Sequence, residues 1–132
     1  MLDKEAHMPD EIPVIRTIAM PADTNPNGDI FGGWLMSQMD LAAGNVAARR
    51  SRGRAATVAG EAMSFLSPVA VGDEVSLFAR VAKLGRTSMR IEVEAWRRAR
   101  ASEQTTKVTE AVFTFVAIDE EGRPRPIPKD EG

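Results

Sequence analysis

The chain has 132 residues, of which 43% are hydrophobic, 27% are charged and 5% are aromatic. This length and composition suit one globular domain with a modest core. No cysteine is present, which excludes disulfides, thiolate zinc sites and a cysteine nucleophile. The formal net charge of -2 provides no broad basic field for nucleic acid, and the few aromatic residues provide no stacking platform for it.

The single histidine, His7, stands in a polar segment near the start of the chain. Metal sites and Ser-His-Asp triads normally need an imidazole held in a packed site, so we expect neither a metal site nor such a triad. We also expect no cofactor. The sequence has no apolar run of about 18 residues. It also lacks the basic and then apolar order of a secretion signal at its start. We therefore expect a cytoplasmic protein that does not enter a membrane.

In chain order, residues 1–12 are rich in charge and proline, and we expect a flexible tail there. A short strand is expected over residues 14–19. A turn-rich segment then leads through a Gly-Gly pair into a predicted helix over residues 33–50. Its apolar residues fall on one broad face at 3.6 residues per turn: Leu35, Met36, Met39, Ala42, Ala43, Val46 and Ala47.

The predicted helix carries almost no charge. Between Gly33 and Ala48 the only charged residue is Asp40, which is unusual for a helix on the surface. We therefore expect this helix to be central and largely enclosed by protein.

The second half of the chain is typical of strands, which we expect over residues 57–65, 74–84 and 106–118. The clearest alternation of apolar and polar residues predicts one more strand. Its packed face would hold Met89, Ile91, Val93 and Ala95. Its other face, which would meet solvent or a partner, would hold Arg90, Glu92, Glu94 and Trp96. Short connections favour antiparallel hairpins. The sequence thus predicts an α+β domain over residues 13–119, with an antiparallel sheet curled around one long helix, and a proline-rich tail over residues 120–132.

A domain of this kind leaves a sheet edge and part of the helix uncovered, so we expect a homodimer. Asp40 could be a structural aspartate, but a carboxylate among apolar neighbours also suits a general base or a nucleophile. Free N–H groups of Gly33 and Trp34 at the helix start could form an oxyanion hole. Gly33 and Asp40 are about 10 Å apart along the helix axis. They would therefore serve one carbonyl group only if antiparallel helices of two subunits shared the site.

Several motifs, in this order, resemble hotdog-fold acyl-CoA thioesterases, most closely the YciA-type bacterial acyl-CoA thioester hydrolases. The resemblance covers roughly residues 14–128. It depends on residues 20–34 (MPADTNPNGDIFGGW), Met39-Asp40, Thr57-Val58, Phe65 with Pro68, Val71-Gly72-Asp73, residues 85–88 (GRTS) and residues 111–117 (AVFTFVA). It implies a hotdog fold and hydrolysis of acyl-CoA to a free acid and CoA.

The resemblance also implies a catalytic pair, Asn25 and Asp40, contributed across a subunit boundary, with Thr57 assisting the water or the carboxylate. Chemically, Asp40 would activate water or attack the thioester, and Asn25 would orient water or bind the oxyanion. The alternatives are structural. Asn-Pro-Asn-Gly is strong turn chemistry, and a β-branched threonine is ordinary in a strand.

For CoA, the resemblance implies that the turn of Gly85, Arg86, Thr87 and Ser88 faces the nucleotide, although these residues also suit an ordinary hairpin. Arg123 and Arg125 in the tail are further candidates for phosphate or adenine contact. The arginines at 49, 50, 52 and 54 form a denser run, which is more typical of a solvated surface at a helix end.

Two other functions, those of a dehydratase and of a sensor, are alternatives to hydrolysis. A hotdog dehydratase would need a histidine in the core, which this chain lacks. An acyl-CoA sensor would need the pocket and the basic turn but no catalytic pair. The sequence therefore predicts an acyl-CoA thioesterase that forms homodimers, with a trimer of dimers as the implied assembly.

Overall fold

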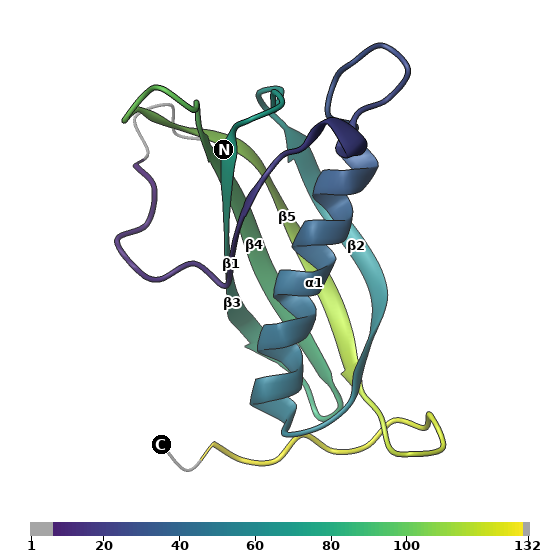
Figure 1. The fold of residues 1–132 in the computed structure, drawn as a ribbon. Coiled ribbons are helices and arrows are strands. Elements are labelled where there is room, and N and C mark those ends of the chain that lie inside the picture. Colours follow the sequence, from purple (N-terminus) through teal and green to yellow (C-terminus); the bar gives the residue numbers. More distant parts are fainter. Residues whose placement is uncertain (1–6, 131–132) are drawn as a thin grey trace.

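The protein is described here by a computed structural model, which covers residues 7–130. One long helix, α1 (Gly32–Ser51), lies against a five-stranded sheet (Figure 1). The elements along the chain are β1 (Ile15–Ile18), a 3-10 turn η1 (Pro21–Asp23), α1, β2 (Ala55–Phe65), β3 (Glu74–Leu84), β4 (Ser88–Arg98) and β5 (Thr105–Ala117). Half of the predicted N-terminal tail, residues 1–6, and the last two residues of the C-terminal tail lie outside the described residues.

All neighbouring strands are antiparallel, in the order β1-β3-β4-β5-β2. Tight connections join β3 to β4 and β4 to β5, as the hairpin prediction required. The two edge strands, β1 and β2, are joined through α1, so the helix crosses one face of the sheet. The predicted α+β arrangement is confirmed.

One face of α1 forms the core with the sheet. Its buried residues recur at helical spacing: Leu35, Met39, Ala42, Ala43 and Ala47. Alternate residues of β4 and β5 pack opposite them: Met89, Ile91, Val93, Ala95, Phe113 and Phe115. A Cβ added at Gly44 would lie 3.5 Å from the Phe115 ring, so glycine and alanine here allow the helix to lie close to the sheet.

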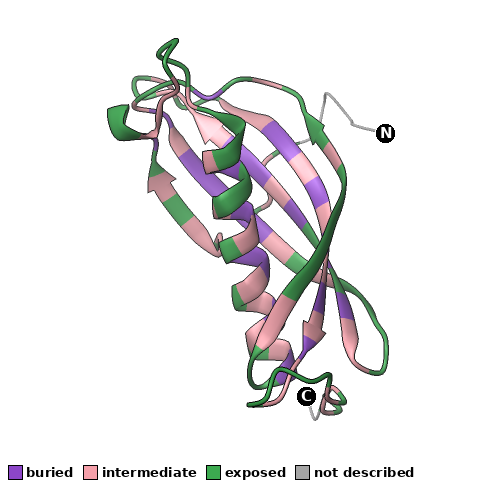
Figure 2. Ribbon diagram, turned by 90° about the vertical axis from the view of Figure 1, so that its right-hand side faces the viewer, coloured by how far each residue is buried: buried purple, intermediate pink, exposed green. Residues whose placement is uncertain are grey.

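The other side of α1 and the edge strand β2 are exposed in the single chain (Figure 2). Leu41 on the helix is 60% exposed and Val58 on β2 is 58% exposed. The prediction that the helix is largely enclosed is therefore wrong for one chain, because only one helix face packs on this chain's sheet. The uncovered surface is apolar and poor in charge, which is the type of surface that another chain covers.

Trp96 also departs from its prediction. The outer face of the sheet does expose Arg90 and Glu92, but Trp96 on that face is only 2% exposed. Its indole N–H donates to Glu94 Oε1 at 2.7 Å, and its register partner on β3, Ser76, is buried as well. Trp96 is thus part of a small packed cluster and does not meet solvent or a partner.

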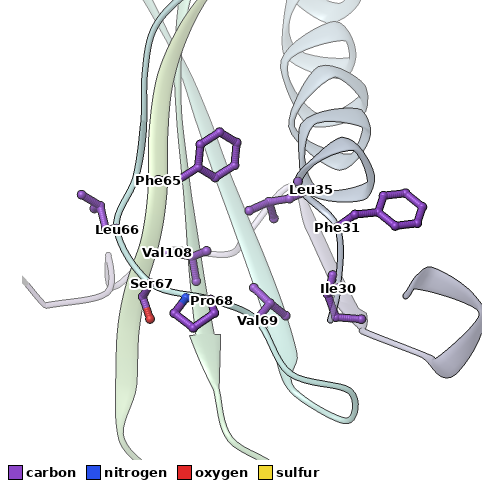
Figure 3. A pocket seen from close by; sticks show the side chains of 10 residues that line it. Ile30, Phe31, Leu35, Phe65, Leu66, Ser67, Pro68, Val69 and Val108 are labelled. Carbon is purple, nitrogen blue, oxygen red and sulfur yellow. The ribbon is translucent and has the colours of Figure 1, made fainter. Parts of the chain in front are cut away.

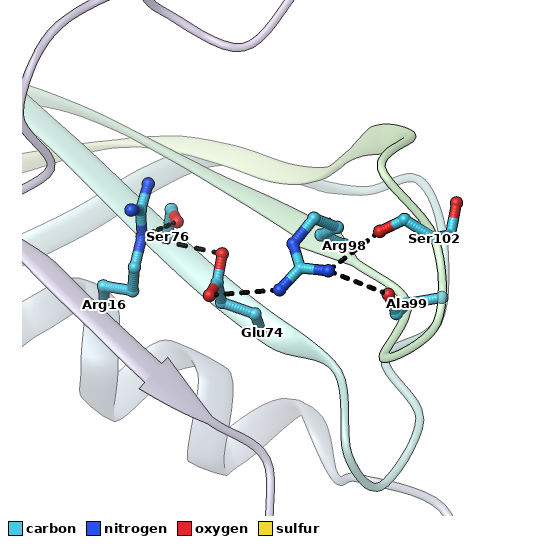
Figure 4. A network of polar contacts seen from close by, with 6 residues as sticks. All are labelled: Arg16, Glu74, Ser76, Arg98, Ala99 and Ser102. Carbon is cyan, nitrogen blue, oxygen red and sulfur yellow. Dashed lines mark hydrogen bonds and ion pairs between the residues drawn. The ribbon is translucent and has the colours of Figure 1, made fainter.

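A polar network on this outer face joins β1 to the middle of the sheet (Figure 4). Glu74 forms ion pairs with Arg16 at 3.7 Å and with Arg98 at 3.4 Å. Arg98 also donates to the carbonyl oxygen of Ser102 at 2.8 Å, which fixes the turn between β4 and β5. These ion pairs are partly solvated, so each contributes at most about 1 kcal/mol to stability.

The chain after β5 returns across one end of the molecule (Figure 1). The backbone N–H of Ile127 donates to the carbonyl oxygen of Arg86, and Arg50 Nη1 donates to the carbonyl oxygen of Pro128 at 2.7 Å. The proline-rich segment therefore lies between the β3–β4 turn and the end of α1. Within residues 7–130, no helix has the length and apolar character needed to cross a membrane.

Candidate active site

The Asp40 carboxylate and the Thr57 hydroxyl are in direct contact. Asp40 is half-buried in the first half of α1, and Thr57 is exposed near the start of β2. The Thr57 hydroxyl donates to Asp40 Oδ1 at 2.6 Å, a short bond of the kind made to a charged acceptor. Within the described part of the chain the second oxygen, Oδ2, has no hydrogen-bond partner. One oxygen is thus held in place, and the other is left for a ligand or a water.

Asn25 lies in the loop before α1, beyond the start of the helix (Figure 1). Its side-chain Oδ1 accepts the backbone N–H of Asn27 at 2.9 Å and that of Asp29 at 3.1 Å. The loop is closed further by the backbone N–H of Asn25, which donates to the carbonyl oxygen of Asp29. Asn25 therefore does stabilise the turn, but only its side-chain oxygen takes part in this. The Nδ2 amide has no partner among residues 7–130 and remains a donor.

The start of α1 has no side-chain cap. Its N-cap residue is Phe31, whose side chain cannot accept a hydrogen bond, and the first turn holds no acidic residue. The backbone N–H of Trp34 donates to the carbonyl oxygen of Phe31 at 3.1 Å. Of the two predicted oxyanion donors, Trp34 is thus already engaged, whereas Gly33 has no recorded partner within the described chain.

An apolar pocket of about 330 Å³ opens beside this helix start (Figure 3). It lies between α1, the end of β2 and the segment that follows β2. The side chains that shape it are Ile30, Leu35, Phe65, Pro68, Val69 and Val108. Gly32 also lines it, so the pocket begins one residue from the free N–H of Gly33. Its volume is at the lower end of the range for small-ligand sites.

The turn of residues 85–88 lies at the opposite end of α1. It is closed by the backbone N–H of Gly85, which donates to the carbonyl oxygen of Ser88 at 2.8 Å. Thr87 contributes its carbonyl oxygen to the N–H of Ala117, whereas the Arg86 side chain is exposed and has no recorded partner in the described chain. These residues therefore do form an ordinary hairpin turn, and the guanidinium of Arg86 remains available to bind a ligand.

A small polar pocket of about 230 Å³ adjoins this turn, and sequence reasoning missed part of it. Gly85 and Ser88 line it, as predicted for a ligand turn, but Lys83, Arg90 and Thr114 line it too. The strand register explains why, because Lys83 is opposite Arg90 and Arg90 is opposite Thr114. The sequence alone does not show how these three strands pair, so it could not predict this grouping.

Arg125, predicted as a CoA contact, is bonded within the chain itself. Its Nε donates to the carbonyl oxygen of Ile118, its Nη1 to that of Ser51 and its Nη2 to that of Arg54 and to Ser51 Oγ, at 2.8 to 3.3 Å. Four of its donors thus satisfy groups around the C-terminal end of α1. Arg123, two residues earlier, is exposed and has no recorded side-chain partner within residues 7–130.

Comparison with known proteins matches residues 27–103 to the model of the thioesterase superfamily. A Zymomonas mobilis protein named as an uncharacterized acyl-CoA thioester hydrolase is 58% identical over 88% of this chain and 78% of its own length. The Escherichia coli acyl-CoA thioester hydrolase YciA is 55% identical over 87% of this chain and 89% of its own. The chain belongs to the thioesterase superfamily.

The solved structures agree with this family and with its acyl-CoA thioester hydrolase members. The crystal structure of a hexameric thioesterase from Yersinia pestis superposes with a TM-score of 0.88 at 50% identity, covering 93% of this chain and all of that one. The hotdog fold that the resemblance implied is confirmed for this thioesterase. In one subunit the fold brings Asp40 to Thr57, but it does not bring either residue to Asn25 or to the residue 85–88 turn.

Among residues 7–130, no cluster of three or more His, Cys, Asp or Glu side chains could hold a metal ion. The groups described at the site are a carboxylate, a hydroxyl, a side-chain amide and a backbone N–H.

Proposed function

We propose that this protein hydrolyses acyl-CoA thioesters to a carboxylic acid and CoA, with Asp40 as the reacting carboxylate. The observation that carries the proposal is the 2.6 Å hydrogen bond from Thr57 to Asp40 in a chain of the thioesterase family. A carboxylate with one oxygen fixed and one oxygen free is oriented for proton transfer or attack. Thr57 acts as a positioning residue in this scheme.

Two routes fit this carboxylate. In the first, Asp40 removes a proton from water, the water oxygen attacks the thioester carbon, the C–S bond breaks and the CoA sulfur takes the proton. In the second, Asp40 Oδ2 attacks the carbon and expels the CoA thiolate, and water then hydrolyses the resulting anhydride. Both routes place negative charge on the carbonyl oxygen, which needs a donor nearby.

The donors for that oxygen are at the start of α1. Gly33 offers a backbone N–H at the positive end of the helix dipole, and Asn25 offers its amide N–H₂ from the adjacent loop. Since Asn25 Oδ1 is held by the loop, its role is that of a donor and not of an acceptor that orients water. These donors lie about 10 Å along the helix from Asp40, so one chain does not complete a site.

A homodimer with antiparallel helices completes it. The uncovered face of α1 and the edge strand β2 are the surfaces that meet in this arrangement, and the start of α1 from one subunit faces Asp40 of the other. We extend this to a trimer of dimers, since the related Yersinia pestis enzyme is hexameric. The cytoplasmic location stays a prediction of the sequence.

The CoA moiety has a basic surface on which to bind. Arg86 is exposed, and Lys83 and Arg90 line the polar pocket next to its turn with the hydroxyls of Ser88 and Thr114. Phosphate groups are bound well by such a combination of cations and hydroxyls. Arg123 remains a candidate from the C-terminal segment. The acyl chain then occupies the apolar pocket beside Gly32.

The test is release of CoA thiol from acetyl-, butyryl-, hexanoyl-, octanoyl- and decanoyl-CoA. We expect hydrolysis by the native protein and a loss of about a thousandfold in kcat for Asp40→Ala. Thr57→Val keeps the shape of the threonine without its hydroxyl, and it should lower kcat about tenfold with little change in KM. Full activity of a folded Asp40→Ala variant would refute the mechanism. Tight binding of acyl-CoA without turnover by the native protein would identify a sensor instead.

A further inference from the structure

Phe65 owes its position to an irregularity in β2. Glu61 pairs with Val112 of β5, whereas Ser64 pairs with Glu110, so two residues of β2 face one residue of β5 between these pairs. The extra residue is a β-bulge, and Ala62 within it has a φ of 52°, in the left-handed region. The Thr109 hydroxyl donates to the carbonyl oxygen of Ser64 and fixes the strand just after the bulge.

The bulge changes which face of the sheet the following side chains occupy. Glu61 lies on the outer face, where it forms an ion pair with Arg90 at 2.6 Å. In a regular strand Met63 and Phe65 would share that face, because side chains alternate with a period of two. The extra residue puts them on the helix face instead. Met63 accordingly packs against the core, and Phe65 points toward α1.

The Phe65 ring lies against the start of α1. A Cβ added at Gly32 would lie 3.6 Å from both Cε1 and Cζ of this ring, so the two are in close proximity without a clash. In Figure 3 the ring projects from the end of β2 toward Leu35. Phe65 is nevertheless 54% exposed in the single chain, so no core packing explains its place.

We propose that Phe65 is the residue that limits the size of the acyl group in this pocket. This rests on the proposed hydrolysis of acyl-CoA and adds its specificity determinant. The ring forms one wall of the 330 Å³ pocket beside the start of α1. Removal of the ring enlarges this pocket and admits longer acyl chains.

The experiment compares Phe65→Ala with Val71→Ala over butyryl-, hexanoyl-, octanoyl- and decanoyl-CoA. Two further methylene groups that become buried change kcat/KM by about tenfold. Phe65→Ala should therefore raise the ratio of kcat/KM for decanoyl-CoA to that for butyryl-CoA by at least about tenfold. Val71→Ala removes an exposed apolar side chain that does not line this pocket, and it should leave the ratio unchanged.

Phe65→Trp provides the opposite change, since a larger ring should lower the same ratio. It also serves if Phe65→Ala does not fold, which circular dichroism and size-exclusion chromatography would reveal. An unchanged or lower ratio for a folded Phe65→Ala, or an unchanged ratio for Phe65→Trp, would overturn the proposal. If the proposed function itself is wrong, the native protein will not hydrolyse butyryl-CoA, which is a different result from an unchanged ratio.

Discussion

The two ends of α1 differ in how their unpaired backbone groups are satisfied. At the C-terminal end, Arg125 donates to the carbonyl oxygens of Ser51 and Arg54, so that end is closed by the protein itself. At the N-terminal end, Phe31 provides no cap and the N–H of Gly33 has no recorded partner in the described chain. An apolar pocket adjoins the open end.

This difference separates structure from function within one helix. A helix start without a cap is less stable by roughly 1 kcal/mol than a capped one, and it retains donors for an anionic ligand. A helix end closed by an arginine gains stability, because the cation lies near the negative end of the helix dipole. Two arginines close in sequence, Arg123 and Arg125, thus have different roles, which their residue type alone does not reveal.

The largest effect expected at the closed end is that of Arg125→Ala. It leaves the carbonyl oxygens of Ser51, Arg54 and Ile118 and the hydroxyl oxygen of the buried Ser51 without the donors of Arg125, so the free energy of unfolding should fall by about 2 kcal/mol. Denaturant unfolding at a fixed protein concentration measures this. Arg123→Ala, an exposed change in the same segment, should stay within about 0.5 kcal/mol of the native protein. Equal stability of the two variants would contradict the conclusion that Arg125 stabilises the C-terminal end of α1.

A smaller effect is expected for Arg86→Ala, which tests the exposed cation next to the closed end. If Arg86 holds a CoA phosphate in the ground state and in the transition state alike, its removal should raise KM about fivefold and leave kcat nearly unchanged. Arg100→Ala, an exposed arginine in the turn between β4 and β5, is the matched control and should change neither constant. An unchanged KM for Arg86→Ala would remove this turn from the CoA site.

The fold was predictable because its signals are local. The period of 3.6 located α1, which begins and ends within one residue of its predicted bounds. The period of two in β4 identified the buried face of that strand. The expectation that Trp96 meets solvent or a partner was wrong, because Trp96 is buried beside Ser76 of the neighbouring strand and bonded to Glu94. Local alternation assigns a face but does not say what covers it.

The site was less predictable, because it depends on distant pairings. Asp40 and Thr57 were paired through the resemblance to a family, and their contact crosses from a helix to an edge strand. Nothing in the letters Glu-Ala-Met-Ser signals the bulge at Ala62, since alanine has no preference for a positive φ. The bonds of Arg125 depend on how the chain returns after β5. The catalytic roles and the domain limits stay predictions.

The central claim is that each active site takes Asp40 from one subunit and the helix start from the other. Coexpression of an Asp40→Ala chain with an Asn25→Asp chain tests it, because Asn25→Asp keeps an oxygen that can close the loop and replaces the amide donor by a carboxylate oxygen. Each variant alone should be nearly inactive. Random pairing gives half mixed dimers, each with one intact site, so the mixture should recover about a quarter of native activity. A mixture no more active than its separate variants would contradict a shared site.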